Sequence, residues 1–137
     1  MASAVPMDSA LLDEWLIELV RRRWTFHYVP DREAPEAIAA VFRWRGLGLA
    51  DVVVLIHAGY AWGYRVVLAT PDADPFRPEV LVHSCEDTPI RVIREVLTIP
   101  PPGHPAMSGV PSAATDAERR LAAKFTGRRC VIRPPRG

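Results

Sequence analysis

Two histidines and one cysteine are the residues of this chain whose types and spacing could support chemistry: His57, His83 and Cys85. One residue separates His83 from Cys85, so their side chains share a face if this segment is a β-strand. Two imidazole nitrogens and one sulfur can bind zinc with the fourth position left open. The sequence therefore offers a zinc site at these three residues, although it contains no CxxC or HExxH motif.

The same residues also permit a cysteine-dependent enzyme, in which Cys85 attacks a substrate and His83 or His57 accepts the thiol proton. The surrounding sequence lacks the motifs of cysteine hydrolases, and it contains no GxSxG, GxGxxG or Walker sequence. Isolated histidines and cysteines are more often structural. We therefore interpret the chain as a non-enzymatic protein without a cofactor, and we retain a small metal- or cysteine-dependent enzyme as the alternative.

Strands must position these residues, and the most apolar stretch of the chain predicts two of them. Its β-branched and aromatic residues favour strands over 51–57 and 62–69, joined by a glycine-containing turn at 58–61. A third strand over 79–84 completes a meander in which the first and third strands run parallel. The two histidines then lie near the same end of the sheet, with backbones about 10 Å apart.

Apolar periodicity and capping residues predict the remaining elements. Pro35 favours a helix start, whereas residues 41–45 alternate as a strand, and we predict a strand there. We predict helices over about 8–23, 88–99 and 115–126, and further strands over 24–29, 37–45 and 130–133. The predicted fold class is α+β, with an antiparallel sheet of about four to six strands around a central meander. An N-terminal helix and one or two C-terminal helices pack on this sheet.

Length and composition fit one ordinary globular domain over residues 1–137. The chain is 49% hydrophobic and 24% charged, with a formal net charge of +1 that argues against nucleic-acid or membrane partners. The proline-rich residues 100–114 predict a connector or exposed arm, and a polyproline ligand is the less favoured interpretation. With two cysteines, no leader pattern and no long apolar run, we expect a soluble, reduced, cytoplasmic protein.

Three aromatic residues, Trp24, Phe26 and Tyr28, alternate on one face of a predicted strand just after the basic run at 21–23. Exposed aromatic side chains on a strand can stack on the bases of single-stranded nucleic acid. The same pattern also fits a strand packed beneath the first helix, which we favour. Nucleic-acid binding through these aromatics and the arginines is the weaker alternative.

The predicted turns pair Arg45 with Ala50 and His57 with Trp62, and this register makes the sheet apolar on both faces. The N-terminal helix can cover one face, so the other face needs a second helix or another molecule. We predict that the second face binds another protein or a second copy of the chain in a micromolar homodimer. The predicted interface consists of Val41, Arg43, Arg45, Val52, Val54, Ile56, Arg65 and Val67.

Overall fold

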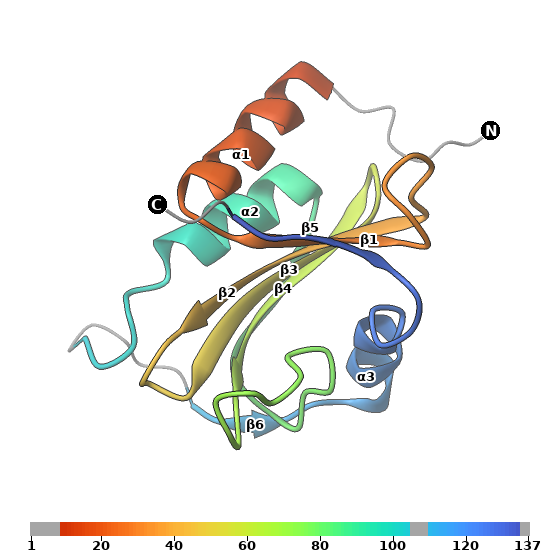
Figure 1. The fold of residues 1–137 in the computed structure, drawn as a ribbon. Helices are drawn as coiled ribbons and strands as arrows, with labels where there is room; N and C mark the ends of the chain where they lie inside the picture. The colour runs from red at the N-terminus through yellow and green to blue at the C-terminus, as the bar shows by residue number, and fades with distance from the viewer. Residues whose placement is uncertain (1–8, 105–109, 135–137) are drawn as a thin grey trace.

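The computed structural model describes residues 9–104 and 110–134, which form three helices and one seven-stranded antiparallel sheet (Figure 1). The strands lie side by side in the order β6-β5-β4-β3-β2-β1-β7. The predicted α+β class and the central meander are confirmed, with slightly more strands than expected. Among the described residues, no helix is long and apolar enough to cross a membrane.

Each predicted helix and strand is present, with ends shifted by a few residues. Residues 37–44, which lie in the segment where the sequence was ambiguous, form a strand. A further two-residue strand lies inside the proline-rich segment 100–114, of which residues 105–109 are outside the described part of the chain. The elements are α1 Ser9–Arg21, β1 Thr25–Val29, β2 Ala37–Trp44, β3 Leu49–His57, β4 Tyr60–Val67, β5 Val80–Asp87, α2 Pro89–Thr98, β6 Ser112–Ala113, α3 Asp116–Ala123 and β7 Cys130–Ile132.

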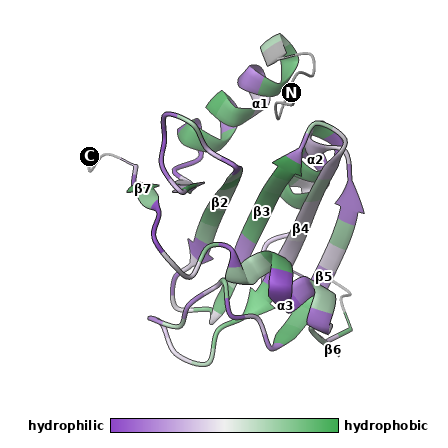
Figure 2. Cartoon of the chain, turned by 90° about the vertical axis from the view of Figure 1, so that its right-hand side faces the viewer, coloured by the Kyte–Doolittle hydropathy of each residue, from purple (hydrophilic) through white to green (hydrophobic). Residues whose placement is uncertain are grey.

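The sheet is covered on both faces, by different parts of the chain (Figure 1). Helices α1 and α2 pack on one face, which we call the α1/α2 face, where Val53 of β3 joins Leu19 and Ile93 in one apolar cluster. Helix α3 and the loop 70–78 cover the other face, which we call the α3 face. Hydrophobic residues dominate β2 and β3 (Figure 2), as expected for central strands buried on both sides.

The predicted register between β3 and β4 is wrong. A two-residue turn joins these strands, so His57 pairs with Tyr60 rather than Trp62, and the register shifts between Leu55 and His57. An odd shift in register moves every side chain to the opposite face of a sheet. As a result Trp62 lies on the α3 face and Arg65 lies on the α1/α2 face. Between β2 and β3 the register differs by two residues, which leaves the faces unchanged.

The predicted interface is also wrong at its centre. Val41, Val52 and Val54 do share one face, but at most 5% of each is exposed. Phe76 from loop 70–78 and Phe125 after α3 pack against this cluster, so the chain itself supplies the second cover. These two aromatics come from a loop and from the end of a helix, where apolar periodicity does not predict which side chains are buried.

Arg65, which was predicted to lie at the interface, forms a buried ion pair instead. Its Nε and Nη2 donate to the carboxylate of Asp51 at 2.6 and 2.9 Å, and the Trp44 Nε1 donates to the same carboxylate at 2.9 Å. The Arg65 Nη1 donates to the Pro100 carbonyl at 2.8 Å. The ion pair compensates the buried charge of Arg65. The hydrogen bond to Pro100 links the segment after α2 to the sheet.

The aromatics of β1 belong to the core, as the favoured interpretation held. Trp24 and Phe26 are buried in the α1/α2 cluster, and Tyr28 packs against it partly buried. Trp24 and Phe26 are therefore not available to stack on nucleic-acid bases.

Candidate functional site

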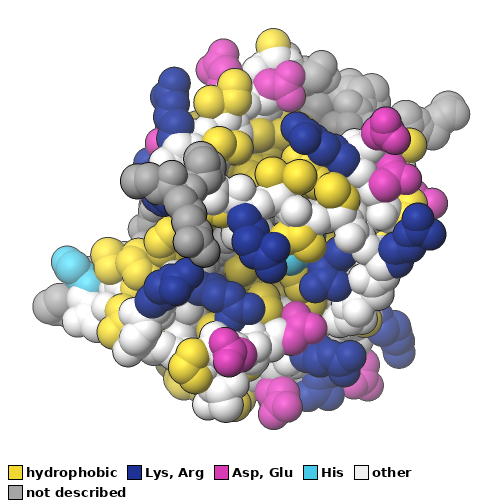
Figure 3. All heavy atoms as spheres, in the orientation of Figure 1, with side chains coloured by type: hydrophobic (Ala, Val, Ile, Leu, Met, Phe, Trp, Pro, Cys, Tyr) yellow, Lys and Arg dark blue, Asp and Glu magenta, His cyan; other side chains and the backbone are white. Residues whose placement is uncertain are grey.

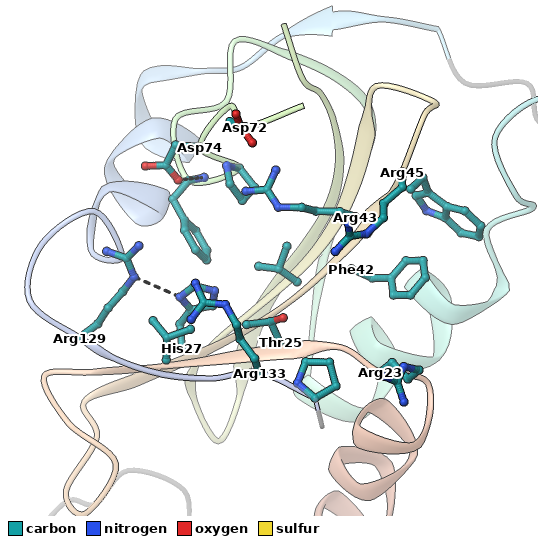
Figure 4. Close-up of a pocket in the computed structure, with 16 residues that line it drawn as sticks. Arg23, Thr25, His27, Phe42, Arg43, Arg45, Asp72, Asp74, Arg129 and Arg133 are labelled. Carbon is teal, nitrogen blue, oxygen red and sulfur yellow. Dashed lines mark hydrogen bonds between the residues drawn. The ribbon is translucent and has the colours of Figure 1, made fainter. Parts of the chain in front are cut away.

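A groove with a volume of about 930 Å³ lies on the α3 face, over the strands that α3 does not cover (Figure 4). Its floor is formed by Thr25 and His27 of β1 and Val41 of β2. Strand β7 forms one side, because its pairing places Val131 opposite His27. The groove therefore lies on the α3 face along the β1–β7 edge of the sheet.

The opposite wall of the groove is the loop 70–78, which several hydrogen bonds hold against the sheet. Tyr64 Oη donates to the Pro75 carbonyl at 2.8 Å, and Arg43 Nη1 donates to the carbonyls of Pro71 and Ala73, each at 3.1 Å. Phe76 points inward, where its ring stacks on that of Phe125 at a centroid distance of 5.1 Å. The wall is thus fixed in place from inside the molecule.

Arginines dominate the charge of the groove. Figure 3 shows basic side chains gathered on this side of the molecule. Two of them, Arg45 and Arg133, are exposed and form no hydrogen bond or ion pair with any residue that the structure describes. Five arginines and two aspartates line the groove: Arg23, Arg43, Arg45, Arg129, Arg133, Asp72 and Asp74.

His27 is a buried histidine at the floor of this basic groove. Its Nδ1 accepts a hydrogen bond from Arg129 Nε at 3.1 Å, and its ring meets Phe76 edge to face at 4.8 Å. Burial, followed by the positive charges of Arg129, Arg133 and Arg43, lowers the pKa of His27 to about 4, although Asp74 opposes this shift. His27 is therefore neutral at pH 7, and the unprotonated Nδ1 of the neutral ring can accept the hydrogen bond from Arg129.

Arg23 reaches the groove from an unusual backbone position. The Trp24 amide donates to the Leu19 carbonyl and the Arg23 amide to the Val20 carbonyl, which is the hydrogen-bond pattern of a Schellman motif at the end of α1. Arg23 occupies the left-handed position of this motif, with φ 69°, where glycine is favoured. An arginine held there at some steric cost is consistent with a functional role for its side chain.

A second cluster lies on the α1/α2 face and contains two of the three residues that the sequence singled out. His83 and Cys85 of β5 share a face as predicted, and Glu95 of α2 lies over them. The potential ligand atoms of these three residues all lie within 4.8 Å of one another. His83 Nε2 and Glu95 Oε2 are 2.9 Å apart.

His57 does not join this cluster. It lies at the β3–β4 turn and pairs with Tyr60, whereas His83 pairs with Arg65, five residues further along β4. The His57 Nδ1 accepts a hydrogen bond from the Gly59 amide at 3.1 Å. The predicted convergence of two histidines is wrong because the short turn and the long β5 place them at different heights in the sheet.

Cys85 is poorly suited to act as a nucleophile. Burial, followed by the negative charge of Glu95 and a hydrogen bond to it, raises the pKa of the Cys85 thiol to about 12. The nucleophilic form of cysteine is the thiolate, which is scarce at neutral pH when the pKa is this high. This property argues against the cysteine-dependent enzyme.

Sequence reasoning found Arg43 and Arg45 but missed most of the groove. His27, Arg129 and Arg133 come together only because β7 pairs with β1. Glu95 was missed because it reaches the cluster from a helix with no ligand motif. Comparisons of the chain with models of protein families, with curated proteins and with solved structures found no match.

Proposed function

We propose that the chain is a non-enzymatic binding module whose groove on the α3 face holds an acidic segment of another protein. The observation that carries this proposal is the charge of the groove, where five arginines face two aspartates. One of these aspartates, Asp74, is already engaged, since its Oδ1 accepts from the Phe76 amide at 2.9 Å and its Oδ2 lies 3.6 Å from the Arg77 Nε.

The distribution of the arginines favours a peptide over a small anion. Sites for small ligands usually bring a few polar groups together in an enclosed pocket. Here Arg45 and Arg133 are exposed, and they project from a β2–β3 turn and from beyond β7 respectively. Apolar side chains, including Phe42, Val131 and Pro134, also line the groove. Arginine around apolar surface is typical of protein–protein interfaces, and guanidinium groups bind carboxylates in a bidentate manner.

The charge of the whole molecule supports a protein partner rather than nucleic acid. The formal net charge is +1, so the positive charge is local to the groove instead of spread over the surface. Trp24 and Phe26, the aromatics that could stack on bases, are buried on the other face. An acidic peptide needs only the local charge and the apolar side chains that line the groove.

The test is binding of a short fluorescent peptide of alternating glutamate and leucine to the full chain, followed by anisotropy at increasing salt. We expect Arg45→Glu and Arg133→Glu each to weaken binding by about tenfold or more, a change of about 1.4 kcal/mol. Affinity should fall as ionic strength rises, because salt screens charges near the surface. The matched control is Arg94→Glu, which makes the same charge change at an exposed position of α2 on the opposite face.

Three outcomes contradict the proposal. One is equal affinity of the Arg45→Glu, Arg133→Glu and Arg94→Glu variants. Another is equal binding of a peptide in which glutamine replaces every glutamate. The third is binding of a single-stranded oligonucleotide, but not of the acidic peptide, through the same two arginines.

A further inference from the structure

We propose that His83, Cys85 and Glu95 form a binding site for a divalent metal ion of the zinc type, on the face of the sheet opposite the groove. The three side chains present nitrogen, sulfur and oxygen donors, and their ligand atoms all lie within 4.8 Å of one another. They are the one such group of three among residues 9–104 and 110–134. The site is independent of the groove and of the binding function proposed for it.

The spacing of the donors is close to what a tetrahedral ion requires. Zinc lies about 2.0–2.1 Å from a histidine nitrogen and about 2.3 Å from a cysteine sulfur, which puts neighbouring ligand atoms roughly 3.3–3.8 Å apart. His83 Nε2 and Glu95 Oε2 are now 2.9 Å apart, in direct contact. Binding of an ion therefore requires these side chains to rotate and open that contact.

Strand pairing and helix packing set the backbone positions around the cluster, so only the side chains need to move when an ion binds. His83 and Cys85 lie two residues apart on β5, which pairs with β4 along most of its length. Helix α2, which carries Glu95, packs so closely on β4 that a methyl group on Gly63 would lie 2.5 Å from a methyl of Val96. Gly63 pairs with Cys85, so this close packing sets the height of the helix above the cysteine.

The chemistry of the donors selects the class of metal. Thiolate and imidazole ligands favour zinc and neighbouring transition metals, whereas calcium and magnesium prefer oxygen. The cluster is also open to solvent, since 30% of the His83 side chain and 51% of the Glu95 side chain are exposed. An ion can therefore enter, and water can complete its coordination.

The test is titration of the chelator-treated full chain with zinc, against a competing chromophoric chelator, and with cobalt. We expect one zinc ion per chain, a higher melting temperature with zinc, and a thiolate-to-cobalt absorption band. Glu95→Gln and Cys85→Ala should each weaken zinc binding by at least about tenfold, since even the loss of an outer-shell partner costs 10–100-fold. Because Glu95 is exposed, its variant should fold normally.

Two variants serve as matched controls. Cys130→Ala removes the other free cysteine, which lies in β7 at the far side of the sheet, and should leave the cobalt band intact. His57→Ala removes the third ligand that the sequence suggested and should leave zinc binding unchanged. The proposal is overturned if zinc binds with less than one ion per chain at saturation, or if Glu95→Gln and Cys85→Ala bind zinc as the wild type does. Loss of binding in His57→Ala or Cys130→Ala alone overturns it as well.

Discussion

At the scale of single residues, His27 in the groove makes the stability of the fold depend on pH. The fold keeps this imidazole neutral because it is buried and three arginines lie near it, which lowers its pKa to about 4. In the unfolded chain the pKa returns to the usual value of about 6.5. Protonation of His27 therefore favours unfolding.

We predict that His27 does not reduce the free energy of unfolding above about pH 6.5. As the pH falls from 6.5 towards 4, the free energy of unfolding should decrease. Over this window the unfolded chain binds a proton that the folded chain does not, which costs up to about 3 kcal/mol. His27→Gln retains an oxygen that can accept from Arg129 but cannot titrate. Denaturant unfolding at several pH values should show a flatter profile for His27→Gln than for the wild type.

The matched control for this prediction is His57→Gln, since His57 is exposed at the β3–β4 turn. Its pH profile should follow that of the wild type. A His27→Gln variant that loses stability between pH 6.5 and 4 as steeply as the wild type does would show that other groups cause the loss.

At the scale of elements, the contact between α2 and β4 depends on one glycine. A Cβ on Gly63 would lie 2.5 Å from Val96 Cγ2 and 2.8 Å from Val92 Cγ1. Gly63 is thus required by close approach, since helix methyl groups occupy the space of a side chain. The helix could not sit at this height above any larger residue.

We predict that Gly63→Ala destabilises the protein by about 1–3 kcal/mol, as overpacking of a filled core does. Val96→Ala in the same chain should recover part of this loss, because it removes the closer of the two methyl contacts. Thermal or denaturant melts of the two single variants and the double variant give the coupling energy.

Gly127→Ala is the control for this pair, because a Cβ there would meet nothing within 4 Å. If the Gly63→Ala and Val96→Ala effects simply add, the helix does not rest on the strand in the way described.

The elements themselves could largely be predicted from sequence, because alternation and capping are local properties. The helix predicted over 115–126 begins with a capping box, in which the Glu118 amide donates to Thr115 Oγ1 at 3.1 Å. The register could not be predicted, because it depended on whether the turn after His57 held two residues or four. That one difference placed Arg65 on the wrong face and hid its partner, Asp51.

At the scale of the whole molecule, the expected homodimer was based on an apolar face that the chain itself covers. Val54 is fully buried beneath the α3 face cover. The arginine-lined groove lies on this face, and it is not the exposed apolar surface that the homodimer prediction required. Association of the chain with itself stays a prediction without that support.

We predict that Val54→Asp unfolds the protein instead of separating a folded dimer, because an unpaired carboxylate in the core costs more than about 4 kcal/mol. Circular dichroism and light scattering of the variant and the wild type at micromolar concentration distinguish these results. If the Val54→Asp variant is instead a folded monomer with half the mass of the wild type, the wild type dimerises through this face.

The groove could not be predicted because it is assembled from distant parts of the chain. The strand pattern predicted Arg43 and Arg45 only as residues of the protein interface. Their combination with His27 and Arg133 required the pairing of β1 with β7 and the position of loop 70–78. No local pattern in the sequence predicts that these side chains lie together.

The pairing of β7 with β1 also has a consequence for how the protein is made. Arg129 and His27, which meet in the groove, are 102 positions apart in the chain. A ribosome adds about 5–20 residues per second, so β1 emerges roughly 5–20 seconds before the strand that completes its edge. During that interval the meander from β1 to β5 can form from neighbouring segments, while the groove still lacks one side. A nascent chain should therefore be unable to capture an acidic partner, and this ability should arise only as translation reaches the residues of β7.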